Sequence, residues 1–88
     1  MGSKEFIEKC KEIVKEYEIN HLDKSDIIPN FEVFVVWSCK TLQNNKALLS
    51  TTLFNGMYYE ITYNGDKKEL YLDAYKKFEN RCIKIEGD

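Results

Sequence analysis

Residues 47–63 read ALLSTTLFNGMYYEITY, and this stretch decides the fold. At its centre, Asn55-Gly56 is typical of the two-residue loop of a type I′ β-hairpin, since both residues tolerate the positive φ angles that this turn requires. Aliphatic, aromatic and β-branched residues, which favour β-strands, flank the dipeptide on both sides. We therefore expect a hairpin of two strands, at residues 47–53 and 57–63.

Further strands are expected on both sides of this hairpin. Residues 31–40 read FEVFVVWSCK and have high β propensity, with apolar side chains on both faces. The polar run at residues 43–45 predicts the turn that joins this segment to the hairpin. A second turn at residues 64–66 precedes a short strand at residues 69–72. The pattern therefore predicts an antiparallel meander of four strands.

Helices are expected at both ends of the chain. An amphipathic helix is predicted over residues 4–21, with Ser3 as its N-cap. Its apolar stripe comprises Phe6, Ile7, Cys10, Ile13, Val14 and Tyr17. A final helix is predicted over residues 74–83, capped by Asp73. Its stripe comprises Ala74, Tyr75, Phe78 and Cys82. Residues 20–30 form a connector, in which we expect Ile27 and Ile28 to pack against the core.

These elements predict a single α+β domain over residues 1–88, in the order α-β-β-β-β-α. Both helices are expected on one face of the sheet. We expect frayed ends at residues 1–3 and 84–88. The hairpin loop pairs Phe54 with Met57, which places one set of side chains under the helices: Leu48, Ser50, Thr52, Tyr59, Ile61, Tyr63, Leu70 and Leu72, joined by Val33, Val35 and Trp37 if Asn44-Asn45 is also a two-residue loop. The other face holds Phe34, Val36, Ser38, Lys40, Leu49, Thr51, Leu53, Tyr58, Glu60, Thr62, Glu69 and Tyr71. A slip of one residue would exchange the two faces.

The second face is the candidate binding surface. Two short helices cannot easily cover both sides of the sheet, and an apolar face of this kind is typical of an interaction site. Candidate binding residues are Phe34, Val36, Trp37, Lys40, Tyr58, Glu60 and Tyr71. We expect them to bind a second copy of the chain or another partner, and the aromatic rings would also suit stacking on a planar ligand. The alternative is that the connector and the tail cover this face, or that the register differs by one residue.

The composition excludes several classes of function. The chain has 13 basic and 15 acidic side chains, a net charge of -2, and Arg81 as its one arginine. This balance suits nucleic-acid binding poorly, because such binding normally relies on basic side chains. The sequence holds no glycine-rich phosphate loop, no secretory core and no apolar run long enough to cross a bilayer. We expect a cytoplasmic protein without a nucleic-acid or membrane partner.

Neither a metal centre nor a catalytic site is expected. Cys10, Cys39 and Cys82 are widely spaced, and with His21 as the one histidine they give no zinc-binding pattern. We expect buried, reduced thiols, and a histidine that caps the first helix or is simply exposed. Nothing in the spacing of the acidic residues singles out a general acid–base pair. We therefore expect a protein that is not an enzyme and uses no cofactor.

One further observation is a resemblance. The run WSCKTLQNNKA at residues 37–47 is specific, and residues 56–60, 63–68 and 71–77 extend the same pattern. Together they resemble a family of small, functionally uncharacterised proteins from phages and prophages of low-GC Gram-positive bacteria. The resemblance covers residues 4–83. It implies no established activity and no site residues.

A phage context implies an accessory role. We expect a dimeric, non-enzymatic binding protein that acts against host defence, either by binding a host immune protein or by sequestering a nucleotide-like immune signal. The alternatives are a single-stranded nucleic-acid-binding or replication accessory protein, and a small hydrolase.

Overall fold

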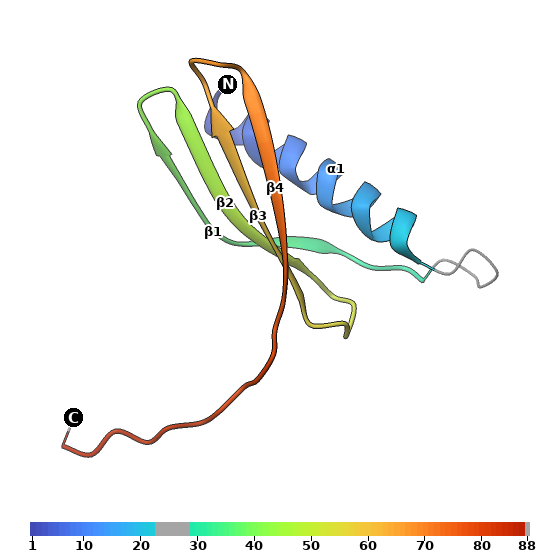
Figure 1. The fold of residues 1–88 in the computed structure, drawn as a ribbon, viewed down its shortest axis with the longest axis vertical. Coiled ribbons are helices and arrows are strands. Elements are labelled where there is room, and N and C mark those ends of the chain that lie inside the picture. Colours follow the sequence, from blue (N-terminus) through green and yellow to red (C-terminus); the bar gives the residue numbers. More distant parts are fainter. Residues whose placement is uncertain (23–28, 88) are drawn as a thin grey trace.

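The fold is an antiparallel meander of four strands with one long helix against one of its faces (Figure 1). The computed structural model describes residues 1–22 and 29–87. Its elements are α1 (Ser3–His21), β1 (Val33–Thr41), β2 (Asn44–Thr51), β3 (Met57–Asn64) and β4 (Glu69–Lys76). The strands pair in the order of the sequence, and every pairing is antiparallel. The predicted α+β class and the meander are therefore confirmed.

The first helix lies where the apolar stripe predicts it. Its cap differs, because Gly2 occupies the N-cap position with an extended backbone and no side-chain cap bond, while Ser3 is the first helical residue. The buried residues of α1 follow one another at intervals of four, and they are Phe6, Cys10, Val14 and Glu18. This spacing puts all four on one stripe of the helix, which faces the sheet.

The core is formed between α1 and the two central strands. Its buried apolar side chains are Phe6, Cys10 and Val14 of the helix, Ala47 and Leu49 of β2, and Tyr59 and Ile61 of β3. Residues of the other two strands, among them Val35 and Leu72, pack at the margin and are only partly buried. The helix therefore covers the middle of one face of the sheet.

A β-bulge at Val36 interrupts β1. Val35 pairs with Leu49 but Trp37 pairs with Leu48, so β1 has one residue more than β2 at this point. An extra residue reverses the alternation of side chains beyond it and bends the strand. In Figure 1 the first part of β1 accordingly runs at a large angle to the second. Trp37 therefore faces away from α1, although the predicted register placed it under the helices.

The loop between β1 and β2 consists of Leu42 and Gln43, with Thr41 opposite Asn44. The turn that joins the two strands is therefore present, but it lies at residues 42–43 and not at the predicted residues 43–45. Asn44 belongs to β2, where its side-chain oxygen Oδ1 accepts a hydrogen bond of 3.0 Å from the backbone N–H of Gly65 in the β3–β4 loop. This bond ties the two loops at this end of the sheet to each other.

The register of the central hairpin also differs from the prediction. Tyr58 lies opposite Ser50, three positions from the predicted partner Leu53, and the loop comprises residues 52–56. The hydroxyl of Ser50 donates to the carbonyl oxygen of Met57 at 2.8 Å, which closes the ladder before the loop. The observed register differs from the predicted one by three residues, an odd number, and this exchanges the two faces of β2. Leu48 and Ser50 therefore lie on the face away from α1, and Leu49 and Thr51 lie on the helix side. Thr52 and Leu53 lie in the loop.

The predicted C-terminal helix over residues 74–83 is wrong. β4 continues to Lys76, with Ala74 opposite Tyr59 and Tyr75 opposite Tyr58. The ladder ends on a 2.7 Å bond from the backbone N–H of Lys77 to the carbonyl oxygen of Gly56. Residues 77–87, which we call the C-terminal arm, then run away from the sheet; they are extended as far as residue 85 and end in a turn (Figure 1). Pairing with β3 has overridden the helical spacing of the apolar residues.

The predicted packing of Ile27 and Ile28 lies outside the described residues. In the part of the chain that is described, no helix is both long and apolar enough to cross a membrane.

Candidate functional site

The sheet face that points away from α1 is the candidate binding surface, and we call it the open face. The ladders place its side chains in three rows across the strands. The first row is Phe34, Ser50, Tyr58 and Tyr75; the second is Trp37, Leu48, Glu60 and Asp73; the third is Cys39, Lys46, Thr62 and Tyr71. Glu69 lies beyond Tyr71 on β4 and shares this face, because it is two residues away.

Large apolar side chains on and beside the open face are about half exposed. The exposed fractions of Phe34, Val36, Trp37, Tyr71 and Tyr75 are between 43% and 52%. The helix cannot cover them, because it packs against the opposite face. The arm runs away from the sheet and leaves them uncovered (Figure 1). Strands β1 and β4 thus each carry a group of exposed aromatic side chains.

The charges of the open face are few and mostly acidic. Lys46 Nζ and Glu60 Oε1 form an ion pair of 3.4 Å across β2 and β3. Asp73 lies opposite Glu60 on β4. The Tyr71 hydroxyl donates a hydrogen bond to the Glu69 carboxylate, and this bond raises the pKa of Tyr71. With one base and three acids, the open face suits a partner with a small excess of basic side chains.

Most of the predicted binding residues meet on this face. Phe34, Tyr58, Glu60 and Tyr71 lie on the open face as expected. Trp37 joins them because of the bulge, and Val36 is exposed beside it, with an exposed fraction of 47%.

Lys40 does not belong to this surface. It lies opposite Asn45 beyond the bulge, on the helix side, and its Nζ contacts the carbonyl oxygen of Met1 at 3.4 Å. Ser38 lies opposite Ala47 and therefore also faces α1. Among the residues of the open face that were not predicted there, Leu48 and Ser50 were missed because of the register and Tyr75 because it was expected in a helix.

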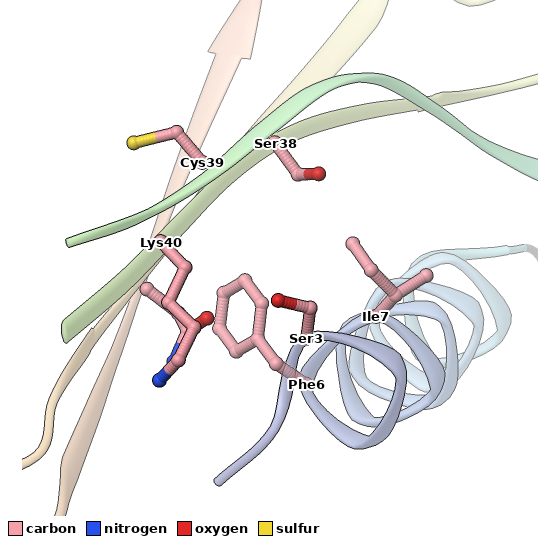
Figure 2. A pocket seen from close by; sticks show the side chains of 7 residues that line it. Ser3, Phe6, Ile7, Ser38, Cys39 and Lys40 are labelled. Atoms are coloured by element: carbon pink, nitrogen blue, oxygen red, sulfur yellow. The ribbon is translucent and has the colours of Figure 1, made fainter. Parts of the chain in front are cut away.

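Lys40 instead lines a small hollow between the N-terminus of α1 and the end of β1. The hollow has a volume of about 110 Å³ and is lined by Ser3, Phe6, Ile7, Ser38, Cys39, Lys40 and Asn45. Figure 2 shows Ser38 and Lys40 on the side of β1 that faces the helix, and the Cys39 sulfur pointing the other way. Asn45 is buried, and its Nδ2 has no hydrogen-bond partner in the structure. This hollow is too small for a nucleotide.

A buried polar cluster lies near the opposite end of α1. The Glu18 carboxylate is 4% exposed and accepts hydrogen bonds from the Tyr59 hydroxyl and from Asn55 Nδ2, the latter at 3.1 and 3.2 Å. Burial and, after it, the hydrogen bond to Glu18 raise the pKa of Tyr59. This cluster was not predicted from the sequence, although Glu18 continues the four-residue spacing of Cys10 and Val14. With its acceptor and donors paired, the cluster is suited to holding the helix on the sheet.

Cys10 and His21 do not form a nucleophile–base pair. Cys10 is fully buried, and burial raises the pKa of its thiol to about 12. His21 ends α1, where its ring stacks on Tyr17 and its Nδ1 lies 2.8 Å from the Tyr17 carbonyl oxygen. Cys39 and Cys82 are exposed, so the expectation of three buried thiols is wrong for both. Within residues 1–22 and 29–87, no group of three or more His, Cys, Asp and Glu side chains is placed to hold a metal ion.

Comparisons with known proteins give one match. The sequence model of a family of unknown function, DUF6275, matches residues 7–85. Neither a curated protein nor a solved structure matches the chain.

Proposed function

Since the chain belongs to DUF6275, a family of unknown function, no activity comes with its family, and we propose one from the open face. The chain is a small binding protein that acts by docking a protein partner on this face. The observation that carries the proposal is the group of large side chains that are 43% to 52% exposed on β1 and β4. Contiguous exposed apolar patches are typical of interaction sites, and aromatic residues dominate the binding energy of such sites.

The chemistry of the polar groups supports binding over catalysis. The Cys10 thiol has a pKa of about 12, so almost none of it is the reactive thiolate at neutral pH. Four ionisable side chains of the open face form two pairs, Lys46 with Glu60 and Tyr71 with Glu69. Groups held in such pairs stabilise the folded surface and are poorly placed to exchange protons with a substrate.

A protein partner is favoured over a nucleotide-like ligand. Three further hollows formed by described residues, with volumes of about 220, 340 and 370 Å³, are lined mainly by charged and polar side chains. None of the lining residues is Trp37, Tyr58, Tyr71 or Tyr75. The aromatic rings therefore form an exposed surface and do not enclose a pocket of the kind that small ligands need.

The partner class follows from the resemblance to small phage and prophage proteins. We propose that the chain acts in the cytoplasm of a bacterial host and binds a protein of the host's immune system. A second copy of the chain is a partner for the same surface, since a two-fold dimer buries one patch on both copies.

The function is tested by phage plating on bacteria that carry a defence system and express the chain. We expect the chain to raise plating efficiency with at least one of a panel of defence systems. Trp37→Glu should abolish this gain, because a buried unpaired charge at an interface is costly. The matched control is Lys11→Glu, on an exposed part of α1, which should keep the gain. Equal gains for both variants would show that the open face is not used.

The nucleotide-sequestering version is tested by thermal unfolding with cyclic and adenine nucleotides. A ligand that binds the folded chain raises its melting temperature in proportion to the logarithm of the ligand concentration. We expect no change with any of these nucleotides. A concentration-dependent rise would favour sequestration and contradict docking of a protein as the main activity.

A further inference from the structure

The C-terminal arm carries apolar side chains that nothing covers. Phe78 is 100% exposed, Ile83 is 71% exposed and Ile85 is 69% exposed. Ile83 and Ile85 are two residues apart, so in an extended segment both point to the same side. A hydrophobic pair aligned in this way, on a segment without a strand partner of its own, is suited to lying against another surface.

The direction of the arm keeps it away from its own sheet. The backbone N–H of Lys77 is bonded to the Gly56 carbonyl oxygen at 2.7 Å, so the arm leaves the sheet along the line of β4. Figure 1 shows it continuing away from both the sheet and α1. Residues 77–86 contain neither glycine nor proline, the residues that most favour a sharp reversal.

The arm is part of the family's domain. The match to DUF6275 extends to residue 85, which includes Phe78, Ile83 and Ile85. An arm included in a family match, yet in contact with little of its own chain, suggests a role outside its own chain.

The arm and the open face are complementary in charge and in apolar character. The arm has three basic side chains, Lys77, Arg81 and Lys84, against Glu79 and Glu86. The open face has the opposite excess, with Glu60, Asp73 and Glu69 against Lys46. Both carry exposed apolar side chains next to these charges. Opposite charges around apolar contacts are the usual arrangement of a specific interface.

We propose that the arm of one copy lies on the open face of a second copy, and that the exchange is reciprocal. This inference rests on the proposed use of the open face as a protein-binding surface and says how a second copy, one of the two partners proposed for that face, binds there. In a two-fold dimer each copy supplies one arm and one face, so each set of exposed apolar residues covers the other. An extended arm of this length spans about 36 Å at ~3.3 Å per residue, which exceeds the length of one strand of the sheet.

Molar mass in solution tests the exchange. At micromolar concentration, light scattering should give about twice the 10.4 kDa mass of one chain. A chain that ends at Lys76 should have the mass of one copy and an unchanged far-ultraviolet circular dichroism spectrum, since the arm adds no strand to its own sheet. Ile83→Ser with Ile85→Ser should weaken the dimer at least tenfold. The matched control Asn80→Ser, at an exposed and uncharged position on the opposite side of the extended segment, should leave it unchanged.

The same measurement separates this inference from the proposed function. If the chain ending at Lys76 remains a dimer while Trp37→Glu makes the full chain a monomer, the open face binds a partner but the arm does not. If removal of the arm gives a monomer while Trp37→Glu has no effect on the mass, the arm binds elsewhere and the exchange is wrong, whereas docking of a host protein on the open face is decided by the plating experiment. A full chain with the mass of one copy overturns the exchange.

Two native cysteines provide a direct probe of the contact. Cys39 is exposed on the open face and Cys82 is exposed on the arm, whereas Cys10 is buried. A bis-maleimide cross-linker with a long spacer should join Cys39 to Cys82 in an equilibrated mixture of ¹⁴N and ¹⁵N chains. Mass spectrometry should then find cross-linked peptide pairs that combine both isotopes. Pairs of one isotope only would mean that the arm folds onto its own chain, and a complete lack of Cys39–Cys82 pairs would also overturn the exchange.

Discussion

The Tyr59 hydroxyl of β3 donates a hydrogen bond to the Glu18 carboxylate of α1 inside the protein. Tyr59 is 1% exposed and Glu18 is 4% exposed. Asn55 of the β2–β3 loop donates to both carboxylate oxygens, and the Tyr17 ring meets the Tyr59 ring edge-on at 5.3 Å. The carboxylate therefore joins the helix to a strand and to a loop. This cluster keeps α1 packed against its side of the sheet. The other side of the sheet is therefore the one that a partner can contact.

Loss of the Glu18 carboxylate should destabilise the fold. Glu18→Ala leaves the Tyr59 hydroxyl and the Asn55 amide without their acceptor, so we expect it to lower the free energy of unfolding by about 2–4 kcal/mol. Tyr59→Phe should cost about 1–3 kcal/mol, because the carboxylate keeps the Asn55 donor. Urea unfolding followed by circular dichroism measures both values.

The control for this pair is Glu16→Ala, an exposed glutamate of the same helix, which should change stability by less than about 0.5 kcal/mol. In a double-mutant cycle, Glu18→Ala and Tyr59→Phe should show a coupling energy of about 1 kcal/mol or more. Additive effects would contradict a direct bond that matters to stability.

Gly65 of the β3–β4 loop lies so close to the β1–β2 loop that a methyl group at this residue should push the two loops apart. A Cβ atom at this residue would lie 2.1 Å from the carbonyl oxygen of Gln43, which belongs to the backbone of the β1–β2 loop. Gly65→Ala should therefore cost about 2 kcal/mol or more, because backbone must shift and the Gly65 N–H bond to Asn44 is strained. Gly2→Ala, with nothing within 4 Å of its Cβ, is the control and should cost less than about 1 kcal/mol, because only the weaker N-cap preference of alanine acts there. Equal melting temperatures for the two variants would contradict this account of the loops.

The helix and the strand positions could be predicted because they depend on local patterns. The four-residue spacing of Phe6, Cys10 and Val14 belongs to one helical stripe, and its continuation to Glu18 was visible but was not used. Asn55-Gly56 does lie in a loop, but the predicted type I′ turn is wrong, because Gly56 has a positive φ of 69° and Asn55 does not have a positive φ. The signal located the loop correctly but not its length.

The register could not be predicted, because it depends on contacts between distant residues. The bulge at Val36 has no local signature in a strand that is apolar on both faces, yet it decides on which face Trp37 lies. At the C-terminus, Leu70, Tyr71, Leu72 and Tyr75 satisfy strand alternation and helical spacing about equally. Pairing of β4 with β3 favours the strand over the helix. Tyr75 therefore lies on the open face, and the arm is not part of a helix.

Leu42 offers a stabilising substitution. Its φ is 56°, in the left-handed region that a leucine enters only at a cost, and its side chain is 82% exposed. Leu42→Gly removes this strain without loss of packing, and after the entropy cost of glycine we expect a gain of about 0.5–1 kcal/mol. Gln43→Gly in the same loop has no such strain to relieve and also loses the hydrogen bond that Gln43 Nε2 donates to Asp66, so it should lose about 1–2 kcal/mol. Thermal unfolding of the two variants measures both effects. A lower melting temperature for Leu42→Gly than for Gln43→Gly would contradict this account.

Stability should fall at alkaline pH because of the buried Cys10 thiol. Burial raises its pKa from the ordinary 9.0 to about 12 in the folded chain. Below pH 9 the thiol is protonated in both states, so its contribution is fully present. Between pH 9 and pH 12 only the unfolded chain ionises, so the free energy of unfolding falls by about 1.4 kcal/mol per pH unit. The raised pKa of Tyr59 adds a loss of the same sign above about pH 10.

Urea midpoints at pH 8, 9, 10 and 11 measure this dependence. Cys10→Ala should flatten the slope between pH 9 and pH 10 by about one proton, even though it lowers stability at pH 8 through the lost packing. Cys39→Ala is the matched control, because its thiol is exposed on the open face and its removal should leave the slope unchanged. An equal slope for Cys10→Ala and the parent chain would mean that the Cys10 thiol ionises as readily in the folded state as in the unfolded one. The contact of Cys10 with the sheet under α1 would then be looser than the structure has it.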